Sequence, residues 1–266
     1  MAKISLVLGG GGARGAAHLG AIKAFQERGL KPQLVVGVSI GALVGAVFCA
    51  FPFSEATERL EAVSKKIKAK ILRQKSYCPY LQTRRFFSEP FKRTLLEDDL
   101  GLGGIRFCDL HTPFFVTAAA LPNFKRVEVG GKEDRSGIVD AVLASSAVQW
   151  PYPWNGKLFL DGGISGSLPV RIAQERGSDY IFAVNLGYLF KRYLDWREYL
   201  PWKIIDYLGK QMVSRELEAA RSAGARIYEI YSPRVESFSV YDFSTPEALQ
   251  REGYETCRRM LEEMER

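Results

Sequence analysis

A serine stands at the centre of a Gly-x-Ser-x-Gly pattern at residues 37–41, directly after a short apolar run that begins at Leu34. This spacing is typical of a nucleophile elbow, in which a buried strand turns sharply into a helix and holds a serine hydroxyl at the sheet edge. Gly37 and Gly41 suit such a turn, because larger side chains would collide in the tight crossing of strand and helix. The helix N-terminus behind Ser39 favours negative charge nearby. Five-residue patterns also recur by chance, so the prediction of Ser39 as a nucleophile needs further support.

A serine nucleophile needs a base, and the sequence offers both histidines and carboxylates. The two histidines are His18 and His111, and none follows His111, whereas the α/β-hydrolase order places the catalytic histidine late in the chain. We therefore expect no conventional triad and interpret His18 as a packed residue that hydrogen-bonds within its helix or to the serine turn. Asp161 follows the apolar run 158–160 and precedes two glycines, which places it at a strand end where α/β sites gather. Asp-Gly is also a common turn pair, so a purely structural role stays open.

A glycine-rich loop at residues 9–15 lies between a short apolar run and a helical pattern. Its Gly-x-Gly-x-x-Gly spacing matches a dinucleotide-binding loop, but that fold needs an Asp or Glu at the end of the second strand, where the Ser39 turn stands instead. Consecutive glycines also expose N–H groups that can stabilise an oxyanion, and a plain strand-to-helix turn is a third reading. Arg14 is expected to pin the loop or to attract an anionic substrate. The oxyanion donors expected here are Gly10, Gly11 and Gly12.

The elements that must position these residues follow from the hydrophobic periodicity. Strands are predicted at Ile4–Leu8, Leu34–Val38, Phe114–Leu121, Lys125–Val129, Lys157–Leu160, Tyr180–Asn185 and Ile227–Tyr231. Helices are predicted after Gly15, from the cap Ser54 to about Arg73, at Arg84–Leu96, around Ile138–Ser145, from Pro169, and from the cap Thr245 to about Met264. This alternation predicts an α/β fold, a mainly parallel central sheet with helices on both faces. We expect one domain over 1–266 with its core at about 3–186, while 187–266 supplies a basic and aromatic helical segment, a last strand and a C-terminal helix.

Composition describes an ordinary globular chain of 266 residues with 47% hydrophobic and 25% charged content. The net charge of +7 suggests affinity for anionic surfaces, either nucleic acid or acidic lipid. The four cysteines are widely spaced, so neither a zinc site nor a disulfide framework is expected, and reduced thiols in a cytoplasmic protein are. Residues 34–53 lack charge and match either a membrane helix or a buried strand followed by a buried helix. We favour the second, because no other span exists and the preceding segment forms half of a β-α-β unit.

Four motifs together resemble the patatin-like phospholipase family, over about residues 3–186. They are the loop 9–15 with His18 and Gly20 after it, Gly37-Val38-Ser39-Ile40-Gly41, Ala144-Ser145-Ser146-Ala147, and Asp161-Gly162-Gly163. The resemblance implies a three-layer lipid acyl hydrolase of phospholipase A or lysophospholipase type, with Ser39 as nucleophile, Asp161 as base and an acyl-enzyme intermediate. It implies an oxyanion hole from the glycine loop and no cofactor or metal. One departure is visible, because many relatives carry Asn shortly before the Pro after Asp-Gly-Gly, whereas this chain has Ser167-Leu168-Pro169.

Two further segments concern the substrate and its surroundings. The basic amphipathic stretch 64–75 suits an anionic membrane surface or, equally, a solvated helix face. The stretch 188–208 mixes Trp, Tyr, Lys and Arg and suits an interfacial anchor, an active-site lid, a packed helical pair or a dimer contact. We expect a phospholipid, lysophospholipid or other acyl ester as substrate, peripheral association with anionic membrane, and no nucleic acid. The rival function is a nucleotide-binding or catalytically inactive module that keeps the glycine loop.

Overall fold

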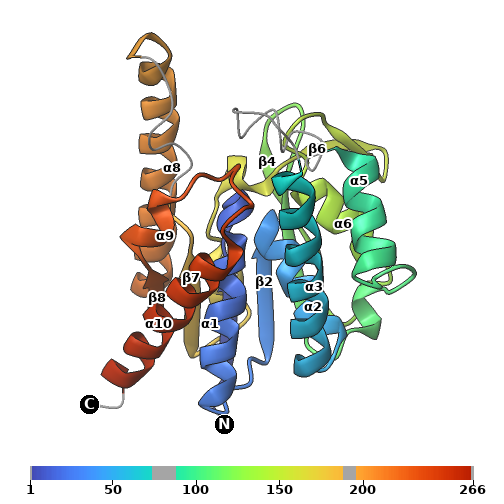
Figure 1. The fold of residues 1–266 in the computed structure, drawn as a ribbon. Coiled ribbons are helices and arrows are strands. Elements are labelled where there is room, and N and C mark those ends of the chain that lie inside the picture. Colours follow the sequence, from blue (N-terminus) through green and yellow to red (C-terminus); the bar gives the residue numbers. More distant parts are fainter. Residues whose placement is uncertain (1, 74–87, 188–195, 265–266) are drawn as a thin grey trace.

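The protein is organised around an eight-stranded sheet (Figure 1). The computed structural model describes residues 2–73, 88–187 and 196–264. The strand order is β5-β6-β3-β2-β1-β7-β8, with β4 on the other edge of β3. The strands are β1 (Ile4–Leu8), β2 (Leu34–Val38), β3 (Phe114–Ala120), β4 (Lys125–Gly130), β5 (Tyr152–Trp154), β6 (Lys157–Leu160), β7 (Tyr180–Asn185) and β8 (Arg226–Tyr231). Strands β3, β2, β1, β7 and β8 pair in parallel, and β4, β5 and β6 pair antiparallel.

The central strands are apolar on both sides, as strands covered by helices on both faces should be. In β1, Leu6 and Leu8 pack into the larger core, while Val7 packs into a second core on the opposite face. The same alternation separates Val35 from Leu34 and Val36 in β2. Because side chains alternate across a strand, this pattern fixes which face each residue covers.

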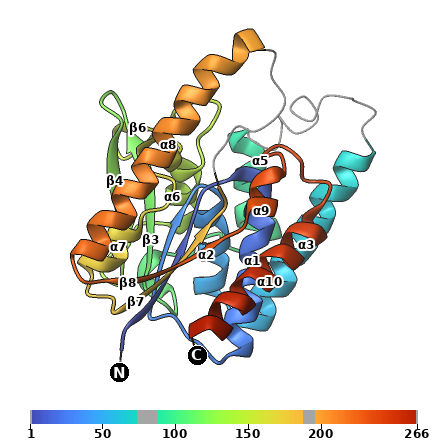
Figure 2. The ribbon, with the colours of Figure 1, turned by 90° about the vertical axis from the view of Figure 1, so that its left-hand side faces the viewer.

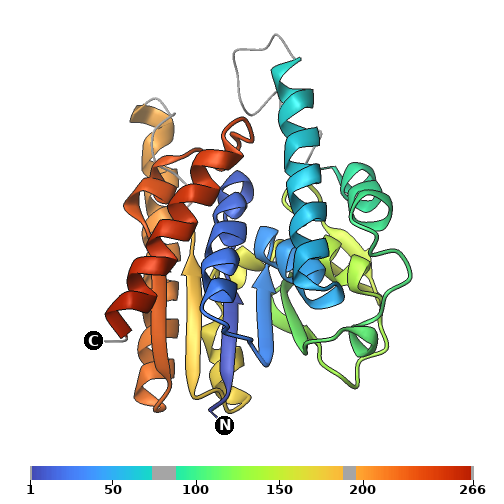
Figure 3. The same cartoon turned by 60° about the horizontal axis from the view of Figure 1, so that its bottom comes forward.

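Helices cover both faces and complete three layers, which confirms the predicted α/β class (Figures 1 and 2). The larger core lies under α1 (Ala16–Glu27), α2 (Ile40–Ala50), α3 (Phe53–Leu72), α6 (Ile138–Ser145) and α10 (Pro246–Met264). Figure 3 shows α1, α3 and α10 on this same side of the sheet. The smaller core lies under α7 (Val170–Glu175) and α8 (Trp196–Ser222). Shorter elements are α5 (Glu89–Thr94), α9 (Pro233–Ser237), and the turns η1 (Gly12–Gly15), η3 (Leu95–Asp99), η4 (Phe107–Asp109) and η5 (Gly162–Ser165).

Several predicted boundaries need correction. Helix α3 begins at Phe53 with Pro52 as its cap residue, so Ser54 is not the cap, because Pro suits the entry to a helix as well as Ser does. The helix predicted at 84–96 is α5 followed by the wider turn η3, and its first residues lie outside the described part of the chain. Strand β5 was not predicted, because three residues with a central proline carry no periodic signal.

The uncharged stretch 34–53 forms β2, α2 and the first residue of α3, so the strand-plus-helix interpretation is correct. None of the helices in the described residues is long and apolar enough to cross a membrane. The basic stretch 64–75 lies largely on α3, whose Val63, Ile67 and Ile71 are buried in the larger core. Its apolar face is therefore not available to a membrane. In the stretch 188–208, residues 188–195 and the side chains up to 206 lie outside the described part of the structure.

Candidate active site

Ser39 sits on a strained turn between β2 and α2. Its backbone angles are φ 55° and ψ −121°, a conformation that a non-glycine residue adopts only where the surrounding structure enforces it. Gly41 lets the turn cross the end of β1, because a Cβ placed there would lie 2.1 Å from the carbonyl oxygen of Leu8. The turn thus presents the Ser39 hydroxyl at the carboxyl end of β2, with the serine 8% exposed.

Asp161 meets Ser39 because of how β6 is registered in the sheet. Strand β2 pairs with β3 up to Thr117, and β6 pairs with the next part of the same strand, at Ala119 and Ala120. β6 runs antiparallel to β3, so its last residue returns toward the end of β2. The Ser39 Oγ donates a hydrogen bond of 2.6 Å to Asp161 Oδ2. The structure therefore brings together the two residues selected from sequence.

The Asp161 carboxylate is held from a second side. The backbone N–H of Gly163 donates a 2.8 Å bond to Oδ1, which makes the Asp-Gly-Gly turn a cap for the short helix η5. Burial raises the pKa of Asp161, while the hydrogen bonds from Ser39 and Gly163 and the charge of Lys92 act in the opposite direction. A raised pKa makes this carboxylate a stronger base than an ordinary aspartate.

The end of α6 supports the serine turn. The Ser39 backbone N–H donates a 2.8 Å bond to the Oγ of Ser145, which is fully buried. The sequence pointed to Ser145 only through the Ala144–Ala147 motif, without a role. The contact explains the motif, because it satisfies a backbone donor that the strained turn would otherwise leave unpaired.

The glycine loop lies against the serine, but its amides are used differently from what was expected. A Cβ at Gly10 would lie 3.5 Å from the Ser39 Cβ, so the loop is in van der Waals reach of the nucleophile position. The Gly10 N–H donates to the Ser167 carbonyl at 3.0 Å, and the expectation that it is a free oxyanion donor is wrong in this structure. The N–H groups of Gly11 and Gly12 have no acceptor among the described residues. Ile40, the first residue of α2, offers another N–H without an intrahelical acceptor, which the elbow pattern itself could have indicated.

Arg14 pins the loop and does not face the site. It is 1% exposed, and its guanidinium donates to the Phe238 carbonyl at 2.8 Å and to the Leu186 carbonyl at 3.2 Å. The substrate-contact alternative for Arg14 is therefore corrected. His18 Nε2 donates a 2.8 Å bond to the Gly9 carbonyl, and burial lowers the pKa of His18 to about 4. His18 is thus a neutral residue that supports the loop from behind.

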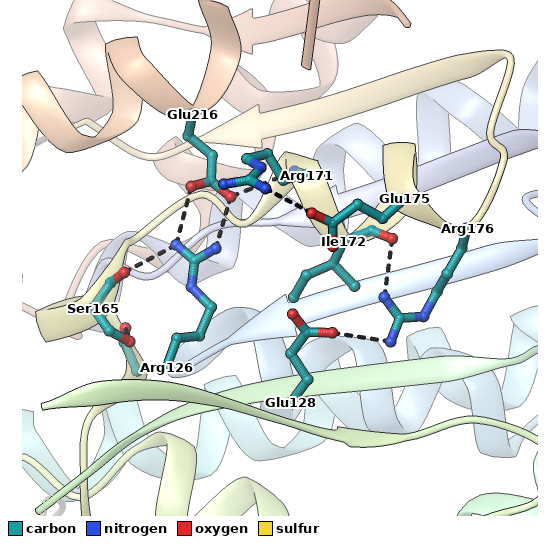
Figure 4. Close-up of polar contacts among 9 residues, drawn as sticks. Arg126, Glu128, Ser165, Arg171, Ile172, Glu175, Arg176 and Glu216 are labelled. Atoms are coloured by element: carbon teal, nitrogen blue, oxygen red, sulfur yellow. Dashed lines mark hydrogen bonds and ion pairs between the residues drawn. The ribbon is translucent and has the colours of Figure 1, made fainter. Parts of the chain in front are cut away.

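Arg126 of β4 holds the turn that follows Asp161, and sequence reasoning missed it. Its guanidinium donates to the Ser165 carbonyl at 2.9 Å and pairs with Glu216 of α8 at 2.8 Å (Figure 4). Gly166, at φ 137°, makes room for it, because a Cβ there would lie 2.1 Å from the guanidinium. Arg126 therefore ties the Asp161 turn to both β4 and α8.

Lys92 is the second residue that sequence reasoning missed, because no motif contains it. It is 9% exposed, on α5, and its ammonium donates to the Ser146 carbonyl at 2.5 Å and to the Ser146 Oγ at 3.3 Å. Burial lowers the pKa of Lys92 to about 8, against the attraction of Asp161 and Glu89. A buried cation therefore lies beside the Ser39–Asp161 pair.

Ser39 opens into a cavity of about 130 Å³, comparable with apolar cavities of about 150 Å³ that stay dry and bind small apolar ligands. Its walls come from α1, α2, α3, α5 and the start of α10, and most of the side chains are aliphatic or aromatic. Polar side chains on the wall include Ser39, Ser64, Lys92, Ser146 and Gln250. The cavity suits an apolar chain whose reactive end reaches Ser39.

The parallel sheet, the strained serine turn and the Ser-Asp hydrogen bond define a protein of the α/β serine-hydrolase class. The family model described as Patatin-like phospholipase matches residues 6–173. The chain belongs to the patatin-like phospholipase family.

Curated relatives carry the same domain within longer proteins. The chain is 36% identical over 188 residues to Neuropathy target esterase sws of Drosophila melanogaster, an alignment that covers 69% of this chain and 13% of that protein. It is 27% identical over 278 residues to human Patatin-like phospholipase domain-containing protein 6, covering 95% and 20%. The chain thus spans a fifth or less of these relatives. VipD from Legionella pneumophila has a similar fold, with a TM-score of 0.53 and 14% identity over 98% of this chain and 67% of that one.

Proposed function

We propose that this chain is a lipid acyl hydrolase that cleaves carboxylic esters through Ser39 and Asp161. The observation that carries the proposal is the 2.6 Å hydrogen bond from the Ser39 hydroxyl to the Asp161 carboxylate, at the opening of an apolar cavity. No described histidine takes part, since His18 is occupied at Gly9. Family membership supports the same chemistry.

The proposed reaction proceeds in two steps. Asp161 accepts the Ser39 proton as Oγ attacks the ester carbonyl, and the free N–H groups of Gly11, Gly12 and Ile40 are the candidate donors for the oxyanion. The tetrahedral intermediate expels an alcohol or lysolipid, which takes the proton from Asp161. Water then attacks the acyl-enzyme, gives a proton to Asp161 and releases the fatty acid, after which Ser39 regains its proton.

The substrate class follows from the cavity. An acyl chain fits the apolar wall, which includes Leu43, Leu60 and Ile67, and places its ester at Ser39. A phospholipid or lysophospholipid is the substrate that meets this requirement. We also propose that 3–186 carries the chemistry and that 187–266 completes the same domain, since Arg14 in the loop is bonded to Phe238.

Peripheral association with anionic membrane is part of the proposal, supported by the net charge of +7. The test is sedimentation with vesicles of anionic and of neutral lipid at low salt. We expect the protein to sediment with the anionic vesicles and to be released at high salt. An equal failure to sediment with both would refute this part alone.

Release of fatty acid from phospholipid and lysophospholipid vesicles tests the function directly. We expect release by the wild-type chain and none by Ser39→Ala. Ser54→Ala is the matched control, because Ser54 is an exposed serine on α3 outside the cavity, and it should release fatty acid at the wild-type rate. Equal release by wild type and Ser39→Ala would refute the proposal.

A further inference from the structure

Three consecutive residues at the end of α6 each hold one group of the site. The Ser145 Oγ accepts the Ser39 N–H at 2.8 Å, and the Ala147 carbonyl accepts the Asp161 N–H at 3.0 Å. Between them, Ser146 accepts the Lys92 ammonium through its carbonyl and its hydroxyl. The segment 145–147 therefore fixes a nucleophile position, a carboxylate and a cation relative to one another, although the three come from distant parts of the sequence.

The cation is placed where a charge is costly. Lys92 is 9% exposed, and an ammonium leaves water only at a large cost unless it meets opposite charge. The charged groups that act on it are Asp161 and Glu89. Glu89 already pairs with Arg93 at 2.7 Å, whereas Asp161 has no salt bridge to a described residue within 4.0 Å. Asp161 is thus the carboxylate whose charge Lys92 is left to balance.

We propose that Lys92 is a positioning residue whose ammonium, held at Ser146, keeps the Asp161 carboxylate ionised and ready to accept the Ser39 proton. The inference rests on the proposed function. Burial alone would favour a neutral aspartic acid, which cannot act as a base. The groups that face the carboxylate and oppose this effect are the Ser39 hydroxyl, the Gly163 N–H and Lys92, and Lys92 is the charged one among them.

The arrangement also keeps the charge of the site balanced during the reaction. Before attack, Asp161 carries the negative charge and Lys92 the positive charge. When the proton moves from Ser39 to Asp161, the negative charge moves to the oxyanion while Lys92 stays positive. Charge is therefore transferred within a site that remains neutral overall, which avoids creating an unpaired charge beside an apolar cavity.

A merely structural role is the competing explanation, since a cation at the carboxyl end of α6 stabilises that helix by itself. The two differ in the pH dependence of the reaction of Ser39 with a fluorophosphonate. Loss of a structural contact slows labelling equally at all pH values. Loss of the charge that ionises Asp161 slows labelling mainly at low pH.

The experiment measures the labelling rate against pH for wild type, Lys92→Met, Lys92→Gln and Lys92→Arg. We expect both neutral variants to shift the acidic limb upward by at least about one pH unit, which means about tenfold slower labelling on that limb and little change above it. Lys92→Arg keeps the charge and should keep the wild-type limb. Lys92→Gln retains an N–H donor for Ser146, so it provides a neutral variant if Lys92→Met fails to fold.

The outcomes separate this inference from the function on which it rests. A folded neutral variant with the wild-type acidic limb overturns the role of Lys92 and leaves the hydrolase proposal standing. The same holds if Lys92→Arg shifts the limb as far as Lys92→Gln does. A folded wild-type chain that is not labelled at Ser39 at any pH overturns both.

Discussion

Replacing Gly41 by alanine tests the geometry of the serine turn. A Cβ at Gly41 would lie 2.1 Å from the Leu8 carbonyl oxygen and 2.8 Å from that of Gly9, both backbone atoms of the central strand and its loop. A carbon and a carbonyl oxygen normally approach to about 3.3–3.6 Å. The end of β1 and the start of α2 must therefore separate by more than about 1 Å.

The expected cost of Gly41→Ala is about 3 kcal/mol, the upper end of the usual overpacking penalty, because backbone must move rather than a side chain. The gain from replacing glycine in a helix offsets about 1 kcal/mol at most. The net loss corresponds to a fall in Tm of roughly 4–12 °C. A displacement of about 1 Å at the nucleophile slows chemistry by about a hundredfold, so fluorophosphonate labelling of Ser39 should fall by that order.

Thermal unfolding followed by circular dichroism and the labelling rate are measured on the same preparations. Gly137→Ala is the matched control, because Gly137 has φ −69° and a Cβ there would meet nothing within 4 Å. It should change stability by no more than about 0.5 kcal/mol. A Gly41→Ala protein that melts and is labelled like wild type would refute the proposed crossing of β1 and the elbow.

Three other predictions concern the supports of the site. Ser145→Ala leaves the Ser39 N–H unpaired and should lower the free energy of unfolding by about 1–3 kcal/mol in urea titrations. Lys92 binds its proton less tightly when folded, so the wild-type chain should gain about 3 kcal/mol of stability relative to Lys92→Met as pH rises from about 8 to 10.5, and a constant difference would contradict this. Arg126→Met frees the Asp161 turn and should cost about 2 kcal/mol and slow labelling, whereas Arg171→Met, at an exposed ion pair, should change neither.

The parts of the fold that sequence could predict depend on local signals. Strand β1 and β2 show as short apolar runs, and the Ser39 turn shows through Gly37 and Gly41, which mark a close crossing wherever it occurs. Asp161 could be selected because an acid before two glycines at a strand end is a local pattern. These residues need no knowledge of distant contacts, so one sequence suffices to place them.

The residues that sequence could not place act through distant partners. Lys92 and Arg126 look like surface cations, and only the packing of α5 and β4 brings them to Ser146 and Ser165. The Gly10 amide was expected to be free, yet its acceptor lies at Ser167, more than 150 residues along the chain. Contacts of this kind carry no periodic signal, because they depend on how the sheet closes around the site.

The Ser39–Asp161 pair as reactive machinery is tested most directly by intact mass after incubation with a fluorophosphonate. Wild type should gain a single adduct that is absent from Ser39→Ala and strongly reduced in Asp161→Asn, with peptide mapping placing it on Ser39. A folded wild-type chain without an adduct, or an Asp161→Asn chain labelled as fast as wild type, would contradict the account.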